Sequence, residues 1–340
     1  MSEKLTVKNV VNINKSTLSA KDNWSTLKYL DTGNITENQI DTLQIFQKGE
    51  KLPSRAKRKV EKGTIIYSTV RPNQKHFGYF DTHSNDLVVS TGFATLDVID
   101  PRINSKYLYY LLTQNSVISQ LQSIGENSTS SYPSIRPEDI GNLSFVFPDI
   151  DIQNKIADIL TSIDKKIQIN NQINQELEAM AKTLYDYWFV QFDFPDQNGK
   201  PYKSSGGKMV YNPELKREIP EGWGVSNLFD AAEVQYGYPF STDYFNSTGE
   251  GVPVIRIRDI LGNDITNYST EEVEDKYRIN VGDVLIGMDG NFHMNYWIKE
   301  NCYLNQRVVK VNSDKLPNMV LKYQIEPFIK LREKSVSRTT

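Results

Sequence analysis

Residues 149 to 192 read DIDIQNKIADILTSIDKKIQINNQINQELEAMAKTLYDYWFVQF, and this stretch decides how the rest of the chain is organised. Apolar residues recur in it at alternating intervals of three and four, which is typical of a coiled-coil seam. The seam comprises Ile152, Ile156, Ile159, Ile163, Ile173, Leu177, Met180, Leu184 and Tyr187, and Lys166 and Asn170 interrupt its middle. About 40 helical residues would form a rod of about 60 Å, far longer than an average helix. The pattern predicts a spacer helix that needs a second helix to cover its seam; the alternative is a core helix of a globular domain.

The segments on either side of this helix resemble each other. In both, a short strand leads into a turn, a second turn leads into a buried strand, and a helix follows the last strand. The matched stretches are residues 29–35 with 254–260, 60–67 with 279–286, and 107–112 with 320–325. Gly63 and Gly282 would supply the positive φ that a tight turn requires. Each segment is therefore expected to have an α+β fold.

These patterns divide the chain into four parts. We expect a first α+β domain at residues 1–148, the spacer helix at 149–192, a polar linker broken by Gly and Pro at 193–219, and a second α+β domain at 220–340. The second copy is expected to be incomplete, because about sixty residues of the repeat, including a second spacer helix, have no counterpart before the sequence ends.

Composition excludes several classes of protein. The 340 residues suffice for two domains, and Cys302, the single cysteine, rules out a disulfide framework or a cysteine-based metal cluster. The sequence has no run of 18 apolar residues and no secretory segment at its start, which favours a cytoplasmic protein that does not span a membrane. The net charge is -3 and the pI about 5.8, so nucleic-acid binding would depend on local clusters.

One such cluster lies between Lys48 and Lys62. This stretch contains seven Lys and Arg residues and only two glutamates. A solvated loop and a loop that contacts phosphates both fit this pattern.

Polar loops that follow buried strands are the candidates for contact with DNA bases. Residues 71–76 and 288–293 form one corresponding pair of such loops. The stretches 128–132 and 335–340 form another corresponding pair, rich in hydroxyls that suit phosphates. The candidate DNA-binding residues are Arg55, Lys57, Arg58, Arg71, Asn73, Gln74, Lys75, Ser130 and Tyr132 in the first domain, and Arg256, Arg258, Asn291, His293 and Arg338 in the second.

Catalytic motifs fit poorly. Gly206-Gly207-Lys208 is followed by Met209 and lacks the first glycine of a phosphate-binding loop. Asn212-Pro213 is followed by Glu214, so no adenine-methylase motif is present. Glu274-Asp275-Lys276 only superficially resembles a nuclease motif. His76, His83 and His293 lack metal-ligand spacing and read as lone surface histidines.

The centre of the chain resembles the specificity subunits of type I restriction-modification systems. The residues that carry the resemblance are 156–160, 163–167, 180–182, 188–195, 198–209 and 218–223. The resemblance implies a non-catalytic protein with two target recognition domains, which bind the two parts of a split double-stranded DNA site. Partner methyltransferase and motor-nuclease subunits would use S-adenosylmethionine, ATP and Mg, and this chain would bind no cofactor.

In that family two such helices pair and methyltransferase subunits dock on them. The docking residues would be Ile156, Ile159, Ile163, Asn170, Ile173, Leu177, Met180 and Leu184. Either the partner subunits, a second copy of this chain or a separate C-terminal fragment would cover the seam. The alternative function, from a different class, is a coiled-coil adaptor whose flanking domains bind proteins.

Overall fold

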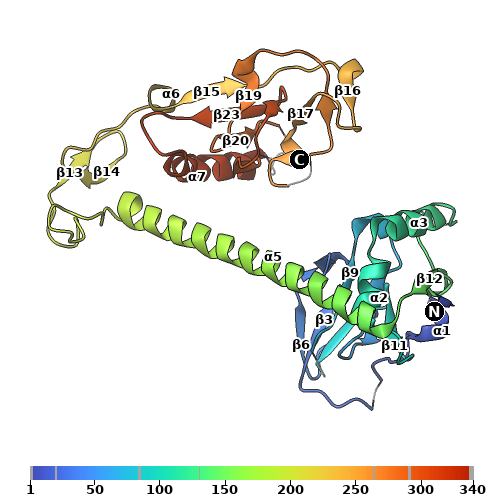
Figure 1. Cartoon of the computed structure of the whole chain (residues 1–340). Helices are drawn as coiled ribbons and strands as arrows, with labels where there is room; N and C mark the ends of the chain where they lie inside the picture. Colours follow the sequence, from blue (N-terminus) through green and yellow to red (C-terminus); the bar gives the residue numbers. More distant parts are fainter. Residues whose placement is uncertain are drawn as a thin grey trace. The chain divides into compact units, whose positions relative to one another are not determined.

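The computed structural model describes residues 3–19, 21–82, 86–129, 131–262, 265–289 and 292–336. Contacts divide the chain into two units, residues 1–171 and 172–340. The helix α5 (Ile150–Tyr185) contributes residues to both units, and Figure 1 shows it as one continuous helix. It is 36 residues long, and a π-helical turn at Asp186–Val190 follows it.

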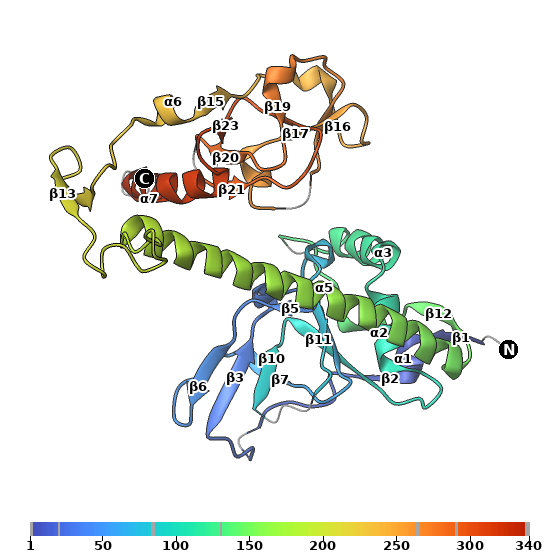
Figure 2. The same cartoon turned by 60° about the vertical axis from the view of Figure 1, so that its left-hand side comes forward.

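The first unit contains two four-stranded sheets (Figure 2). One has the order β6 (Gln44–Gln47), β3 (Thr26–Leu30), β10 (Leu87–Ser90) and β7 (Ala56–Lys59). The other has the order β2 (Val11–Ile13), β11 (Phe93–Val98), β8 (Ile65–Ser68) and β9 (Phe77–Tyr79). β3 and β10 are parallel, and the other pairs are antiparallel. Two further pairs join β1 (Glu3–Thr6) to β12 (Ser144–Phe147) and β4 (Ile35–Thr36) to β5 (Gln39–Ile40).

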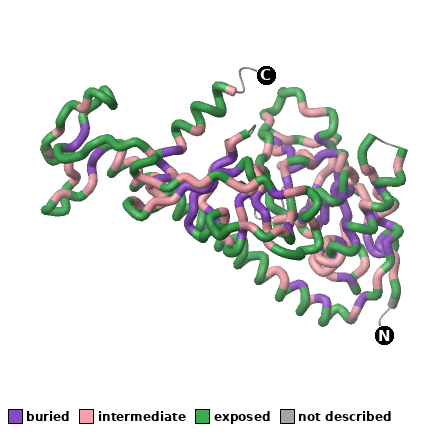
Figure 3. The backbone as a smooth tube through the Cα atoms, turned by 90° about the horizontal axis from the view of Figure 1, so that it is seen from above, coloured by how far each residue is buried: buried purple, intermediate pink, exposed green. Residues whose placement is uncertain are grey.

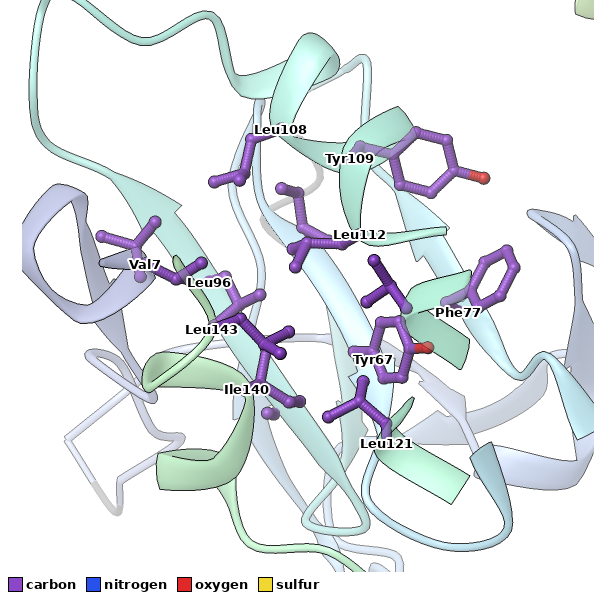
Figure 4. Packing of buried hydrophobic residues seen from close by; sticks show 14 of the residues in the cluster. Val7, Tyr67, Phe77, Leu96, Leu108, Tyr109, Leu112, Leu121, Ile140 and Leu143 are labelled. Atoms are coloured by element: carbon purple, nitrogen blue, oxygen red, sulfur yellow. The ribbon is translucent and has the colours of Figure 1, made fainter. Parts of the chain in front are cut away.

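Helices cover the sheet that contains β8 and β11. They are α1 (Val7–Val10), α2 (Ser105–Leu112), α3 (Asn115–Glu126) and α4 (Pro137–Gly141). Asn104 begins α2, since its side-chain oxygen accepts a hydrogen bond from Tyr107 N at 2.9 Å. Figure 4 shows Leu108, Leu112 and Leu121 from these helices beside Tyr67 and Leu96 from the strands. All four residues of β8 are buried, as expected for a strand covered on both faces.

The second unit repeats this design. One sheet has the order β15 (Glu233–Tyr236), β23 (Val308–Asn312), β20 (Val284–Gly287) and β21 (Met294–Tyr296). The other has the order β16 (Phe245–Asn246), β18 (Tyr268–Ser269), β17 (Val252–Ile255), β22 (Cys302–Leu304) and β19 (Arg278–Ile279). α7 (Asn318–Val336) lies beside β20 and β23 in Figures 1 and 2, with Leu321 and Ile325 in the shared core. The short helix α6 (Leu228–Ala231) precedes β15.

The repeat that the sequence predicts is present in the strand pairing of both units. β17 and β22 are parallel like β3 and β10, and β20 pairs with β21 and β23 as β8 pairs with β9 and β11. The two predicted turn glycines are equivalent, with φ of +92° at Gly63 and +98° at Gly282. Gly63 N donates to Phe80 O at 2.7 Å, and Gly282 N donates to Trp297 O at 2.8 Å. The α+β fold is therefore confirmed in both halves.

The predicted linker is more ordered than its composition indicates. It contains the hairpin β13 (Met209–Asn212) and β14 (Arg217–Pro220). Next to the hairpin, Phe194 stacks on Tyr202 and Trp223, with ring centroids 4.8 and 5.2 Å apart. The Arg217 guanidinium lies 4.6 Å from the ring centroid of Phe192, which has a positive φ of 64°. Aromatic packing, rather than a long run of apolar residues, orders this segment.

The seam of α5 is exposed for most of its length. Near its start, Gln153 and Ala157 are buried, and Gln153 Nε2 donates to Arg102 O at 2.9 Å. The predicted apolar seam residues of α5 are between 36% and 61% exposed. α5 is therefore not an ordinary core helix. Figure 3 likewise shows mostly exposed residues in the last turns of α7. Within the described ranges, no helix combines the length and apolar character needed to cross a bilayer.

Candidate nucleic-acid interface

Loops from both sheets of the first domain meet at one end of it. Thr91 N donates to Arg55 O at 2.9 Å, and Thr69 N donates to Gly92 O at 2.9 Å. These bonds connect the segment before β7 and the segment after β8 to the turn between β10 and β11. We call this end of the domain the first rim; it comprises residues 31–38, 54–55, 69–76, 91–92 and 131–135.

Arg71 and Tyr132, two residues that the sequence analysis selected from distant stretches, are in contact on the first rim. Arg71 N donates to Pro133 O at 2.8 Å, which anchors one segment to the other. The Arg71 guanidinium carbon lies 5.5 Å from the centroid of the Tyr132 ring, a cation–π distance. Both side chains are exposed. Arg71 has a left-handed backbone, with φ of 48°, which is uncommon for a residue with a side chain.

The rest of this loop is held by hydrogen bonds and an ion pair. A 3-10 turn, η2 (Pro72–Gln74), follows Arg71, and Asn73 N donates to Gln122 Oε1 on α3 at 3.2 Å. The side chains of Asn73 and Gln74 are exposed. Lys75 is half-buried, and its Nζ lies 2.6 Å from Glu37 Oε1. The loop therefore presents Arg71, Asn73 and Gln74 to solvent, while Lys75 is already paired.

The histidines of the two rims are not lone surface histidines, so that prediction is wrong for them. His76 is half-buried, and its Nδ1 lies 2.5 Å from Ile35 O. His293 is also half-buried, with Nδ1 3.4 Å from Ile257 O. Each ring connects its loop to the segment that follows β3 or β17, the first strand of the parallel pair in its domain. His83 lies outside the described residues.

Basic residues of β7 differ in their surroundings. Lys57 is exposed, whereas Arg58 is half-buried. The Arg58 Nε is buried and makes no hydrogen bond within the described part of the chain, and this desolvation lowers the pKa of the guanidinium. Lys59 pairs with Asp22, and this hydrogen bond lowers the pKa of Asp22 to about 2. Of these three cations, Lys57 is thus the most accessible to a phosphate.

Burial raises the pKa of Tyr29, a residue of β3 next to the first rim. Its hydroxyl donates to Asp31 Oδ1 at 3.1 Å. The positive charge of Arg55 acts in the opposite direction on this pKa. Arg55 itself is exposed.

The second domain has an equivalent end, which we call the second rim. It comprises residues 256–260, 288–289, 292–293 and 305–307. Gly287 N donates to His293 O at 2.8 Å, as Ser68 N donates to His76 O at 2.8 Å in the first domain. Asn305 N donates to Ile255 O at 3.1 Å, which holds the turn between β22 and β23 against the end of β17.

Arg256 and Arg258 both lie beside a buried carboxylate of the second rim. Their Nε atoms are 3.6 and 3.9 Å from Asp259, which also accepts a hydrogen bond from Arg256 N at 3.0 Å. Burial raises the pKa of Asp259, and the charge of Arg258 opposes that shift. Arg256 is half-buried, whereas the Arg258 side chain is 67% exposed. Arg256 thus mainly stabilises the 3-10 segment η5 (Ile257–Asp259).

The remaining candidates are placed as follows. Ser130, Asn291 and Arg338 lie outside the described residues. Sequence reasoning did not select Arg307, which the structure places in the turn between β22 and β23 with an exposed side chain. Only the repeat could have indicated this residue: the turn between β22 and β23 corresponds to the turn between β10 and β11, which belongs to the first rim. In the ranges that the structure describes, no cluster of three or more His, Cys, Asp or Glu side chains is arranged to hold a metal ion.

Comparison with known proteins gives consistent matches. A family model described as the type I restriction modification DNA specificity domain matches residues 2–179 and 220–334. The specificity subunit of the type I restriction enzyme HindI from Haemophilus influenzae is 36% identical over 168 residues, covering 48% of this chain and 36% of that protein. The specificity subunit of MjaIX from Methanocaldococcus jannaschii is 30% identical over 239 residues, covering 68% of this chain and 48% of that protein. The chain therefore spans less than half the length of these relatives.

Solved structures also match over most of the chain. An HsdS subunit from Thermoanaerobacter tengcongensis aligns with a TM-score of 0.42 and 17% identity, covering 96% of this chain and 80% of that one. The S subunit of a type I restriction-modification system from M. genitalium aligns with a TM-score of 0.48 and 15% identity, covering 98% and 80%.

Proposed function

The chain belongs to the type I restriction-modification DNA specificity family, and from this premise we propose that it recognises double-stranded DNA on behalf of partner subunits. The observation that carries the proposal is the repeated rim: the two domains present equivalent loops on the same strand framework. In this proposal each rim reads one part of a bipartite target. The chain acts in the cytoplasm and performs no catalysis of its own.

Two kinds of contact are expected on the first rim and its neighbour β7. Arg71 has an exposed guanidinium suited to a guanine edge, where two hydrogen bonds to O6 and N7 distinguish the base. The exposed Arg55 and Lys57 suit phosphate oxygens, which position the protein without reading sequence. Asn73 and Gln74 supply amide groups of the kind that pair with adenine.

The seam of α5 is the proposed attachment site for partners. Covering a half-exposed Ile, Leu or Met side chain is worth about 1 kcal/mol, so the whole seam offers several kcal/mol of association energy. We propose that methyltransferase subunits, which use S-adenosylmethionine, bind along this helix. A motor-nuclease subunit that uses ATP and Mg joins them for cleavage. A second copy of the chain, or a separate C-terminal fragment, competes for the same seam.

A methylation comparison tests the proposed function. Genomic DNA is sequenced for modified adenine in the host with and without this gene, and we expect one bipartite motif to lose its methylation in the deletion strain. An unchanged methylation pattern would contradict DNA recognition. If the chain binds the methyltransferase but their complex does not bind duplex DNA, the adaptor function, in which the flanking domains bind proteins, is the better description.

Matched variants test the role of the seam. Leu177→Asp and Met180→Asp place charge on the seam, whereas Gln175→Asp places it on the opposite face of the same exposed helix. We expect the first two to abolish binding of the methyltransferase and the third to leave it unchanged. Light scattering of the free chain then shows whether it forms dimers: a dilute, stable monomer would exclude self-pairing.

A further inference from the structure

We infer that Arg307 is the base-reading arginine of the second rim, in the role that Arg71 has in the first. This inference rests on the proposed function and assigns a specificity-determining residue to it. The chemical group it would read is the edge of a guanine in duplex DNA.

Equivalent backbone hydrogen bonds place Arg307 beside the correct loop. Thr69 N donates to Gly92 O at 2.9 Å in the first domain, and Met288 N donates to Arg307 O at 3.0 Å in the second. The turn that contains Arg307 therefore adjoins the loop after β20, as the turn that contains Gly92 adjoins the loop with Arg71.

The guanidinium comes from a different segment in each domain: from the loop after β8 in the first, and from the turn between β22 and β23 in the second. The first domain has Arg71 in the loop after β8, whereas residues 288–293 of the second contain neither Arg nor Lys. At Gly92 a Cβ atom would lie 2.8 Å from the Thr32 methyl carbon, so a side chain there requires Thr32 to move. In the second domain the matching position is Arg307, whose guanidinium extends to the loop after β20.

An ion pair holds that guanidinium at the loop. Arg307 Nη1 lies 2.6 Å from Asp289 Oδ2, and the two side chains are 63% and 62% exposed. An exposed pair of this kind adds little stability, so the guanidinium can exchange Asp289 for another acceptor without a large cost. Its planar group matches O6 and N7 of guanine with two parallel hydrogen bonds. By contrast, Arg256 is half-buried and lies beside the buried Asp259.

The test uses the full chain with the methyltransferase subunit of its host and a pool of DNA duplexes with randomised positions. Bound duplexes are sequenced for the wild type, Arg307→Ala, Arg307→Lys, Asp289→Asn and the control Arg332→Ala, which removes an exposed arginine of α7 outside the second rim. Arg307→Ala should lower the preference for guanine at one position about 5- to 150-fold, and only in one part of the motif. Arg307→Lys should keep overall affinity and retain only part of that preference, since lysine also binds guanine O6 and N7 but lacks the planar guanidinium. Arg332→Ala should retain the wild-type motif, and Asp289→Asn should retain the guanine preference at the position that Arg307 reads.

Three results would overturn the inference. The first is an unchanged motif and affinity for Arg307→Ala, and the second is an equal loss of affinity for every duplex in that variant, which would indicate a phosphate contact. The third is an equal loss in Asp289→Asn, which would assign the effect to the ion pair. If the wild type itself enriches no motif, the proposed function fails and the inference fails with it, so the two failures are distinguishable. Thermal unfolding checks that the Arg307 variants fold, and we expect no change because the residue is exposed.

Discussion

Replacing Arg71 with alanine or with glycine separates the guanidinium from the backbone that carries it. Arg71 has a φ of 48°, a conformation that costs a residue with a side chain about 1 kcal/mol and that glycine adopts readily. Its guanidinium also lies over Tyr132 at 5.5 Å, a contact worth about 0.5–1 kcal/mol at an exposed site. Alanine loses the contact and keeps the backbone cost, whereas glycine loses the contact and removes the cost.

The expected magnitudes follow from these terms. Arg71→Ala should be less stable than the wild type by up to about 1 kcal/mol, and Arg71→Gly should be close to the wild type. In a unit of this size, 1 kcal/mol corresponds to a shift in Tm of about 2–4 °C. Both variants should lose about 1–3 kcal/mol of binding to the selected duplex, which is about 5- to 150-fold in Kd. Fluorescence anisotropy with labelled duplex measures the Kd, and thermal unfolding measures the stability.

The two measurements give distinct refutations. If Arg71→Gly binds the duplex much better than Arg71→Ala, the shape of the loop, rather than the guanidinium, determines affinity. If both variants bind with the affinity of the wild type, Arg71 does not read a base. Agreement of the two Kd values at a reduced affinity, with unequal Tm values, is the result that the structure predicts.

Three further outcomes are expected. Lys57→Ala should weaken binding to every duplex alike and make the plot of log Kd against log salt shallower by about 0.9, as anisotropy over a salt series will show; a sequence-dependent loss would contradict a phosphate contact. Lys310→Ala leaves the buried Asp283 without its cation, 4.0 Å away, so we expect a loss of about 3 kcal/mol or more in urea unfolding. The control Lys330→Ala removes an exposed pair and should cost about 0.5 kcal/mol; equal losses would contradict the argument from burial. The pKa of Asp22 falls from 3.8 to about 2, so its contribution to stability is complete above about pH 4 and disappears as the pH falls to about 2. Asp22→Asn should therefore flatten the dependence of Tm on pH in this interval, and an unchanged profile would show that the pair with Lys59 does not form.

Local patterns were sufficient to predict the framework of both domains. The seam of α5 has a regular period, and Gly63 and Gly282 mark turns whose φ angles only glycine adopts easily. The two-residue strands β16 and β18 had no comparable signal, because two residues show no periodicity. The order in the linker was missed for a related reason: Phe194, Tyr202 and Trp223 meet through tertiary packing, and their spacing in sequence does not reveal it.

The arginines of the two rims were harder to predict from the sequence than the strands. Arg71 was selected because a polar run follows a buried strand, which is a local signal. Arg256 was selected on its charge, but an Arg-x-x-Asp sequence does not disclose that the carboxylate is buried and that Arg256 caps a 3-10 turn with it. Arg307 lacked a local signal, since its position becomes meaningful only when the turn between β22 and β23 is matched to the turn that contains Gly92.

Substitutions in the strands and substitutions on the rims therefore have different structural effects. All residues of β10 and β8 are buried, so a change there alters packing in a close-packed interior. Arg71 and Arg307 are both exposed, but their loops are not interchangeable: a side chain at Gly92 requires Thr32 to move, while the matching position holds Arg307. The guanidinium of each rim thus stands on a different one of two adjacent loops. On the proposed function, we expect an exchange of an arginine between these loops to change target preference while the strand pairing stays the same in both domains.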